Sequence, residues 1–472
     1  MDKTSIVLLT LITYKALLIV IGIWASKRVN SEEDYFLGGR QLGPVVAALS
    51  YSASSSSAWS LLGMSGAAYL LGLSSIWIIA GALAGVIFVW IFVAPRMLKY
   101  SHDHKVLTIA DFLIHGVEDR WKKKIIQLSA FVILVSFSFY IAAQFQGAGN
   151  TFASTFDIPM TSSIIIGGLI IMIYTFLGGF WAVSVTDAVQ GILMIVAAVA
   201  LPVCALIDVG GVGELVKGLE QLNRPELLSL SGANVGLTAI GFAVGSIAIG
   251  FGPVGQPHLL VRFMALRDEK AMRQARILTI VWFVVVFLGM FMVGLTANVL
   301  IPDPVHGVEA VFFQLTDSVF SPVFAAIILA AVLSAIMSTA DSQLLVGASS
   351  ISYDLKIADR FKSHAVLVSR CSVAFLVILS IIIALYVPAT IFERALFAWN
   401  ALGAAFGPIV IMKLFGRRIS GRGVFLAVLT GFSSAVFLFL QPNTPGDILE
   451  RCIPFLLGMG VLLFDSRRTK KT

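Results

Sequence analysis

Long runs of apolar residues, separated by short polar segments, alternate along the whole chain. A helix that crosses the hydrocarbon core of a bilayer needs about 20 apolar residues. Thirteen runs meet that length, near residues 5–26, 42–70, 74–95, 125–149, 161–180, 186–207, 236–260, 277–300, 321–350, 368–388, 392–412, 423–440 and 451–466. The first run is too long for the apolar part of a secretory signal, so we interpret it as a retained span. The pattern therefore predicts an all-α polytopic membrane protein with about 13 transmembrane helices.

The composition supports this interpretation and excludes several other classes of protein. Of the 472 residues, 58% are hydrophobic and only 12% are charged, whereas a soluble domain is roughly 25% charged. A soluble enzyme, a disordered chain and a nucleic-acid-binding domain are therefore excluded. The longest connecting segments, near 96–124 and 208–235, are too short to fold as a catalytic or output domain. We expect a small-molecule solute and membrane lipid as partners, and the oligomeric state stays open.

The basic residues gather in alternate connecting segments, which indicates an orientation. With the N-terminus outside, the cytoplasmic segments contain all but six of the 33 lysines and arginines, the exceptions being Lys3, Lys15, Lys217, Arg224, Arg394 and Arg451. Because cytoplasmic loops are enriched in Lys and Arg, we predict an integral protein of the plasma (bacterial inner) membrane with a cytoplasmic C-terminus. The same bias explains the net charge of +7 without an anionic partner. Lys15, in the middle of the first span, is expected to snorkel to the interface or to pair within the bundle.

Two spans contain stretches that weaken an α-helix. Residues 50–59 include six serines, whose hydroxyls compete for backbone hydrogen bonds. Residues 250–258 include two prolines and three glycines. Interrupted helices at membrane depth are tolerated only beside protein or a water-filled cavity. The alternatives are a close helix-packing face for the serines and a simple kink or loop for the second stretch.

The positions of the two stretches predict an internal repeat. Five crossings begin with each of them, and because five is odd, the two stretches cross in opposite directions. Interrupted helices at matching positions of two inverted halves indicate the binding site of a transporter. We divide the chain into a first peripheral span with a cytoplasmic loop (1–41), a five-helix repeat (42–207), an extracellular loop (208–235), a second five-helix repeat (236–412), and two peripheral spans with a cytoplasmic tail (413–472).

The ninth span contains a polar face that points to a cation. Residues 335, 338, 339 and 342 share one helical face, which offers mainly hydroxyls, and Asp341 lies beside it. Asp187 lies at similar depth in the sixth span, and a carboxylate at that depth is functional by default. Hydroxyls, carbonyls and carboxylates are ligands of hard cations, so we predict Na⁺. The alternatives are a helix N-cap for Asp187, hydrogen bonding within the bundle for Asp341, and coupling to protons by a titrating carboxylate.

Five stretches together resemble the sodium/solute symporter family, and within it the sodium/proline symporters. They cover the chain from about residue 5 to residue 466 in order and at family-like spacing. They are residues 34–40 (Asp-Tyr-Phe-Leu-Gly-Gly-Arg) with 42–44, residues 178–187, residues 255–258 (Gly-Gln-Pro-His) with 261–265, residues 335–339 (Ala-Ile-Met-Ser-Thr) with 343–345, and residues 403–408.

The resemblance implies a core of two inverted five-helix repeats with broken first helices, and it implies site residues. One Na⁺ would lie between the broken second span and the ninth span, held by the backbone oxygens of Ala53, Ser56 and Ala335 and the hydroxyls of Ser338 and Thr339. A second sodium site, found in some members, would use Asp187, Asp341 and Ser342 together with Ser338. The solute would lie near the break, against Ser54, Ser55, Ser57, Trp59, Tyr140, Gln256 and Pro257.

Three positions depart from the pattern of the proline branch. Ser55 stands where an aspartate is usual, Asp341 stands where a small hydroxyl is usual, and Ile249 lies about where a tryptophan is expected. We interpret the chain as a sodium-coupled symporter, not an enzyme, that imports a small polar organic solute by alternating access, with proline as the first candidate and Na⁺ as the only metal. The alternatives are a carrier of another small amino or carboxylic acid, coupled to protons or sodium, a channel, and a transport-like membrane sensor.

Overall fold

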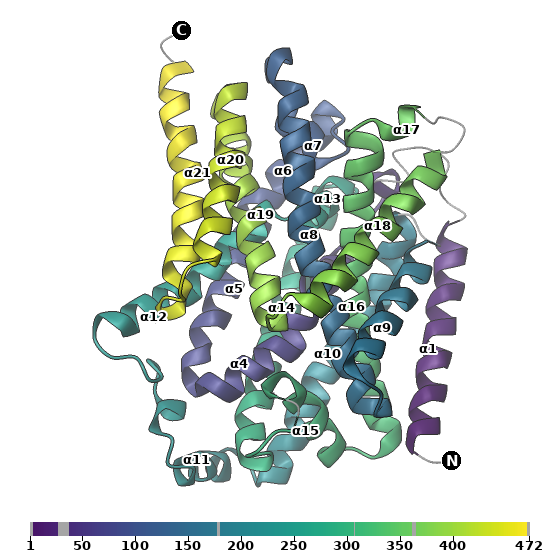
Figure 1. Ribbon diagram of the computed structural model, residues 1–472, viewed down its shortest axis with the longest axis vertical. Helices are drawn as coiled ribbons and strands as arrows, with labels where there is room; N and C mark the ends of the chain where they lie inside the picture. The colour runs from purple at the N-terminus through teal and green to yellow at the C-terminus, as the bar shows by residue number, and fades with distance from the viewer. Residues whose placement is uncertain (1–2, 27–36, 177–179, 306, 361–364, 470–472) are drawn as a thin grey trace.

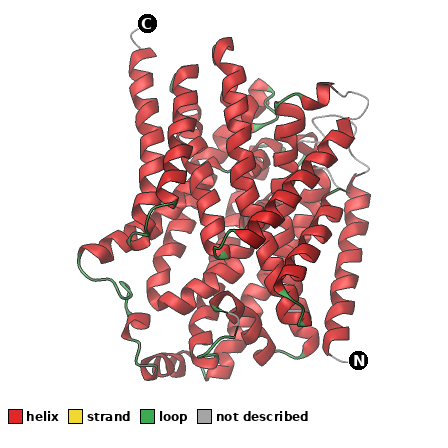
Figure 2. Ribbon diagram, viewed as in Figure 1, coloured by secondary structure: helices red, strands yellow, loops and turns green. Residues whose placement is uncertain are grey.

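The computed structural model describes residues 3–26, 37–176, 180–305, 307–360 and 365–469. In these residues every regular element is a helix (Figure 2), and the only β-type pairing is an isolated parallel bridge between Leu42 and Leu266. The all-α class is therefore confirmed. Some residues used in the sequence argument lie outside the described part: Lys27, Arg28, Asp34, Tyr35, Phe36, Gly178, Gly179, Lys362, Lys470 and Lys471.

Each predicted span is found as a helix or as a run of consecutive helices. The uninterrupted ones are α1 (Lys3–Ser26), α8 (Asp119–Phe156), α9 (Met160–Thr175), α10 (Phe180–Val209), α14 (Glu269–Leu300), α16 (Pro322–Ser349), α18 (Ala365–Tyr386), α19 (Ile391–Leu414), α20 (Gly421–Phe439) and α21 (Ile448–Thr469). The third predicted span is α5 (Ile76–Phe88), η4 (Val89–Val93) and α6 (Ala94–His104). Judged by length and composition alone, ten of the described helices are long and apolar enough to cross a membrane.

The second and seventh predicted spans are both broken. The second consists of α3 (Pro44–Ser55), η2 (Trp59–Gly63) and α4 (Met64–Leu71), with a gap between α3 and η2. The seventh consists of α12 (Leu237–Ile247), η6 (Ala248–Gly255) and α13 (Pro257–Ala265). α3 and α13 each begin with a proline, whose fixed φ and missing N–H suit the first helical position. Interruptions therefore occur where the serine and the Gly/Pro stretches predicted them.

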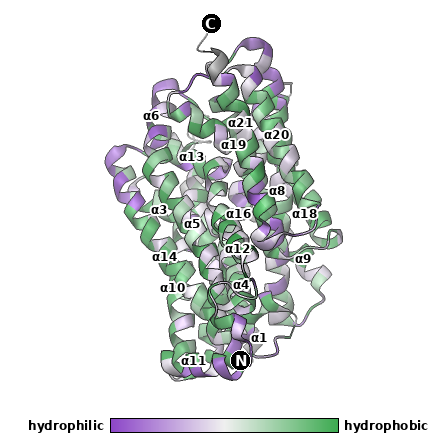
Figure 3. Cartoon of the chain, turned by 90° about the vertical axis from the view of Figure 1, so that its left-hand side faces the viewer, coloured by the Kyte–Doolittle hydropathy of each residue, from purple (hydrophilic) through white to green (hydrophobic). Residues whose placement is uncertain are grey.

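Short elements connect these spans at the two ends of the bundle. They are η1 (Gly38–Arg40), η3 (Gly72–Ser75), α7 (Ile109–Ile114), α11 (Val212–Gln221), η5 (Pro225–Leu228), η7 (Val308–Ala310), α15 (Val311–Val319), η8 (Ser350–Asp354), α17 (Ile357–Arg360) and η10 (Pro445–Asp447). The chain starts and finishes at opposite ends of the bundle (Figure 1). Polar residues gather at these ends and apolar residues between them (Figure 3). This arrangement agrees with an odd number of crossings.

The interior of the bundle is built around the two broken helices. α3 packs against α10, α14 and α16, while η6 packs against α5 and α19. α8 contacts both α16 and α19, so it joins the two groups. α1 lies at one edge of the bundle against α10 and α16, and α20 and α21 pack together and against α19 (Figure 1). The two breaks are therefore enclosed by protein, as non-helical backbone at membrane depth requires.

Candidate functional site

The first break exists because two backbone amides are diverted from the helix. In a continuous helix the amides of Ala58 and Trp59 would bond the carbonyls of Ser54 and Ser55. Instead, the Ala58 amide donates to the Gln144 side-chain oxygen at 2.9 Å, and the Trp59 amide donates to the Ser57 hydroxyl at 3.3 Å. The last carbonyls of α3 are therefore released, and they lie at the negative end of the helix dipole.

Hydroxyls of α16 face these released carbonyls. The Ser338 hydroxyl donates to the Ala53 carbonyl at 3.0 Å, and the Thr339 hydroxyl donates to the Ser54 carbonyl at 3.0 Å. The Ala335 carbonyl also accepts from Ser338, at 3.2 Å. Ser56 is the C-cap of α3. The structure thus gathers oxygen atoms of α3 and α16 in one buried place, a donor set that suits a small hard cation.

A buried arginine of α13 connects α3, α10 and α16 near these oxygens. Arg262 of α13 is 2% exposed. Its guanidinium donates to Asp187 at 2.8 Å, to the Ser342 hydroxyl at 2.7 Å and to the Ser50 hydroxyl at 2.9 Å. The Ser54 hydroxyl also donates to Asp187, at 3.0 Å. Asp187 and Ser342, predicted for a second sodium site, are therefore neighbours, but the Arg262 guanidinium bonds both of them.

Two sequence-based expectations need correction here. Arg262 was counted among the cytoplasmic loop residues, yet the structure places its side chain inside the bundle. It belongs to the stretch 261–265 that carries the resemblance, but no role was predicted for its charge. The helix-cap interpretation of Asp187 is also wrong, because α10 already begins at Phe180, two turns earlier. A salt bridge to Arg262 stabilises the Asp187 carboxylate instead.

Asp341 and Lys15 form a second charged region next to this one. Asp341 is fully buried, and neither carboxylate oxygen has a hydrogen-bond partner of standard geometry among the described residues, although the Ser342 amide lies nearby. The Lys15 ammonium contacts the sulfur of Met337, one turn before Asp341 on α16. Lys15 therefore points into the bundle rather than snorkelling to the interface.

Aromatic side chains from four elements pack against one another beside the first break. The ring of Trp59 lies 5.7 Å from Phe287 and 6.4 Å from Trp399, measured between centroids. Tyr140 lies 6.2 Å from Trp399, and its hydroxyl donates to Ser57 at 3.4 Å. All these side chains are buried or nearly so. Trp399 of α19 was not predicted, because it lies outside residues 403–408, the stretch of the eleventh span that carries the resemblance.

The second break adds polar groups to the same region. Gln256, the extended residue between η6 and α13, donates from its side-chain amide to the carbonyls of Trp399 at 3.1 Å and Gly252 at 3.3 Å. Its side-chain oxygen has no hydrogen-bond partner within the described residues. Of the residues predicted to contact solute, Ser57, Trp59, Tyr140 and Gln256 are linked by these contacts.

Three other residues predicted to contact solute lie in different surroundings. The hydroxyl of Ser54 joins the Arg262 cluster instead. Ser55 is buried at the end of α3. Pro257 lines a separate cavity between α13 and the end of the bundle that carries the C-terminus. The predicted solute residues are therefore divided between the aromatic group, the surroundings of Arg262, the end of α3 and this cavity.

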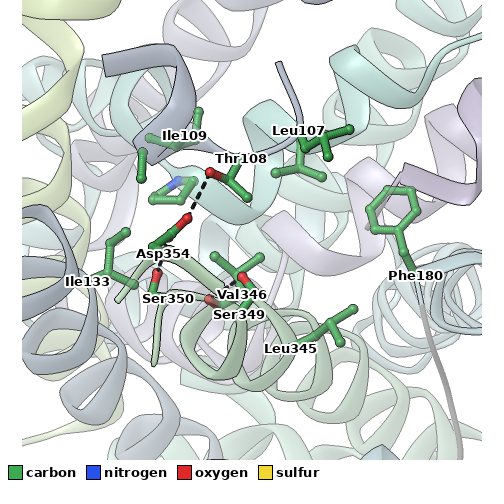
Figure 4. A pocket seen from close by; sticks show the side chains of 13 residues that line it. Leu107, Thr108, Ile109, Ile133, Phe180, Leu345, Val346, Ser349, Ser350 and Asp354 are labelled. Atoms are coloured by element: carbon green, nitrogen blue, oxygen red, sulfur yellow. Dashed lines mark hydrogen bonds between the residues drawn. The ribbon is translucent and has the colours of Figure 1, made fainter. Parts of the chain in front are cut away.

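α7 and the segment before it line one side of the cavity beside Pro257 (Figure 4). Leu107 and Thr108 line it from the segment that starts α7, Val346 lines it from α16, and Asp354 lines it from η8. The Thr108 hydroxyl donates to Asp354 at 3.0 Å. Asp111, in α7 outside the spans, accepts bonds from the Leu107 and Thr108 amides. Burial nevertheless raises the pKa of the Asp111 carboxyl above its usual range, so desolvation outweighs these bonds.

Comparison with known proteins decides the family. The family model described as "Sodium:solute symporter family" matches residues 35–431. The chain belongs to the sodium:solute symporter family. The resemblance noted in the sequence is thereby confirmed, and so is the conclusion that the protein is a transporter and an integral membrane protein rather than an enzyme.

Curated relatives of this symporter match along nearly its whole length. The sodium/proline symporter 2 of Staphylococcus saprophyticus is 34% identical over 98% of this chain and 92% of its own. The osmoregulated proline transporter OpuE of Bacillus subtilis is 32% identical over 98% of this chain and 95% of its own. The high-affinity proline transporter PutP of Bacillus subtilis is 34% identical over 93% of this chain and 92% of its own.

Solved structures share the fold of the symporter at low sequence identity. A Na⁺-coupled sialic acid symporter in a substrate-bound outward-open state superposes with a TM-score of 0.80 at 17% identity, covering 99% of this chain and 98% of the other. The transporter Mhp1 in a closed conformation gives a TM-score of 0.59 at 14% identity, covering 93% and 96%. The helical transporter architecture is therefore shared well beyond the range of recognisable sequence similarity.

Proposed function

We propose that this symporter couples Na⁺ entry to the uptake of proline. The observation that carries the proposal is the group of oxygens between α3 and α16, together with the aromatic side chains of Trp59 and Tyr140 beside the same break. The relatives matched over nearly their full length are, by name, transporters of proline. One positive charge that crosses 100 mV releases about 2.3 kcal/mol, enough to concentrate a zwitterion roughly fiftyfold.

The sodium site we propose consists of the backbone oxygens of Ala53, Ser56 and Ala335 and the hydroxyls of Ser338 and Thr339. The hydroxyls already donate to carbonyls at the end of α3. A cation between the two helices would replace these bonds with coordination, and hydroxyl hydrogens can rotate away to present lone pairs. Because the break itself provides the free carbonyls, ion binding would also stabilise one geometry of α3.

The solute site we propose lies between Trp59, Tyr140, Trp399 and Gln256. The aromatic faces suit the apolar ring of proline, and they attract its ammonium group through their π-electrons. The side-chain oxygen of Gln256, which has no partner in the described part of the chain, can accept a hydrogen bond from the same ammonium. Since α3 and η2 lie on either side of the break, the ion and the solute would stabilise the same local geometry, which is the basis of coupling.

We also propose the orientation and the domain boundaries that the sequence predicts. The N-terminus lies outside and the C-terminus in the cytoplasm, and the working core consists of residues 42–207 and 236–412. The positions of the two broken helices support this division, since each begins one of the two halves. Alternating access would then move the halves around the site near the middle of the membrane.

Uptake of labelled proline by proteoliposomes that contain the purified protein tests the proposal. Wild-type uptake should require an inward Na⁺ gradient, and a pH gradient alone should not drive it. Ser338→Ala and Thr339→Ala each remove one hydroxyl ligand and should raise the Na⁺ concentration for half-maximal uptake about tenfold, which corresponds to about 1.4 kcal/mol.

A matched control is Ser433→Ala on the exposed face of α20, where the hydroxyl donates to the Leu429 carbonyl of the same helix. This variant should keep the wild-type Na⁺ requirement. Uptake driven by a pH gradient without Na⁺, or an unchanged Na⁺ requirement in both α16 variants, would contradict the proposal.

A further inference from the structure

Four charged side chains, one each from α1, α10, α13 and α16, interact in the interior of the bundle. Asp187 and Arg262 form a salt bridge of 2.8 Å. Asp341 interacts electrostatically with Asp187, Arg262 and Lys15. With Lys15 protonated, two carboxylates and two cations make the group neutral. We call these four residues the charge cluster.

The charge cluster needs its cations because carboxylates at membrane depth are costly when they are not compensated. Arg262 compensates Asp187 directly. Among the described residues Asp341 has no salt-bridge partner, and the Lys15 ammonium is held one helical turn away, beside Met337 on α16. A neighbouring bond, between the hydroxyls of Tyr14 and Ser334, fixes α1 against α16 at the same level. Lys15 is therefore positioned rather than free to reach the membrane surface.

We infer that Lys15 and Arg262 are resident counter-ions that close the charge cluster to a second sodium ion, so that one Na⁺ binds per cycle at the α3–α16 site. The assignment replaces the second sodium site that the resemblance implied for Asp187, Asp341 and Ser342. It rests on the proposed function, because the single Na⁺ of the α3–α16 site is then the ion that is coupled to solute uptake. Lys15 thereby becomes a positioning residue that belongs to a peripheral helix.

The hydroxyl of Ser342 supports the inference independently of charge. A sodium ion at this place would need lone pairs from Ser54 and Ser342, together with the Asp187 carboxylate. All three already interact with the Arg262 guanidinium, which donates to the Ser342 hydroxyl at 2.7 Å and to Asp187 at 2.8 Å. The guanidinium thus holds the ligands that the ion would use.

Binding of Na⁺ in the absence of solute tests the inference. The thermal unfolding midpoint of the purified protein in detergent is measured against Na⁺ concentration, with choline chloride keeping the ionic strength constant. Wild type should give a Hill coefficient near 1. Lys15→Met leaves Asp341 uncompensated, so a second cation should be recruited and the coefficient should rise toward 2.

Three further variants separate charge from folding. Lys15→Arg keeps the charge and should behave as wild type. Asp341→Ser leaves a surplus positive charge and should raise the Na⁺ concentration for the half-maximal shift about tenfold. The double variant Lys15→Met with Asp341→Ser should return both quantities to the wild-type values. If Lys15→Met does not fold, the Asp341→Ser and double variants decide the result.

The outcomes distinguish the inference from the proposed function. A wild-type coefficient near 2, or an unchanged curve in both Lys15→Met and Asp341→Ser, would overturn the inference while sodium binding itself stands. The absence of any Na⁺-dependent shift in wild type would instead refute the proposed sodium coupling, and the inference would fall with it.

Discussion

At the scale of single residues, the contact between Gly252 and Trp399 shapes the aromatic wall of the solute site. A Cβ atom on Gly252 would lie 1.7 Å from one indole carbon of Trp399 and 1.9 Å from its nitrogen. The indole also donates to the Ile249 carbonyl at 3.3 Å. Only glycine therefore lets the break of the seventh span and this ring occupy adjacent positions.

Gly252→Ala should damage solute binding more than it damages the fold. The added methyl group must displace the indole, and such overpacking costs about 1–3 kcal/mol. We expect the Michaelis constant for proline uptake to rise at least tenfold, whereas Gly22→Ala, at a position of α1 with no atom within 4 Å of the new Cβ, should leave it unchanged. Equal constants in the two variants would show that Trp399 does not form part of the solute site.

The residues that the sequence did not reveal have a common cause. The serine-rich residues 50–57 and the Gly/Pro stretch 250–258 disfavour a regular helix through their own backbone preferences. Both breaks could therefore be located from local composition alone. Gln144, Arg262 and Trp399 act on segments far away in the chain, and each is a single polar or aromatic residue without periodic partners. Their roles depend on which helices become neighbours, and one sequence does not contain that information.

At the scale of elements, α7 forms part of the wall of the cavity beside α13. One hydroxyl does two tasks: Thr108 accepts from the Asp111 amide at 3.1 Å as the N-cap of α7, and it donates to Asp354 at 3.0 Å. The start of the short helix and its attachment to η8 therefore depend on the same atom.

Thr108→Val should loosen α7, because it removes an N-cap worth about 0.5–2 kcal/mol together with the bond to Asp354. The measurement is the labelling rate of Val346→Cys, a cavity position, by a thiol reagent in inside-out vesicles, after Cys204, Cys371 and Cys452 have been replaced by serine. We expect labelling to become several-fold faster.

A matched control exists at the opposite end of the bundle. Thr390 also forms a capping box, with Glu393 at the start of α19. Thr390→Val should therefore weaken a helix start of the same type without changing the labelling of residue 346. Similar acceleration in both variants would mean that a general loss of stability, and not the opening of α7, controls access to the cavity.

At the scale of the whole molecule, the distribution of charge predicts which end faces the cytoplasm. Lys217 lies in α11, at the end of the bundle where the chain begins (Figure 1), and Arg417 lies in the loop between α19 and α20 at the other end. In the cysteine-free background, Lys217→Cys should react with a membrane-impermeant thiol reagent on intact cells. Arg417→Cys should react only after the cells are permeabilised, and the reverse pattern would invert the proposed orientation.

The number and order of the spans could be predicted well, because the apolar runs and the alternation of basic loops are global patterns. The interior charges could not. Arg262 was placed by the same alternation rule, which treats a basic residue as a marker of the membrane surface. The rule fails for a cation that has a carboxylate to compensate inside the bundle.

The bridge between Leu42 and Leu266 ties the start of α3 to the residue after α13. The Leu42 amide donates to the Ala265 carbonyl, and the Arg267 amide donates to the Leu42 carbonyl, both at 3.1 Å. Since only main-chain atoms take part, substitution of either leucine leaves both hydrogen bonds intact. Proline at position 42 is the exception, because it has no amide hydrogen to donate. With the proposed orientation, an inward opening would either move α3 and α13 together as one rigid unit or break these two bonds first. The timing of solute release would then depend on main-chain contacts that side-chain substitutions leave unchanged.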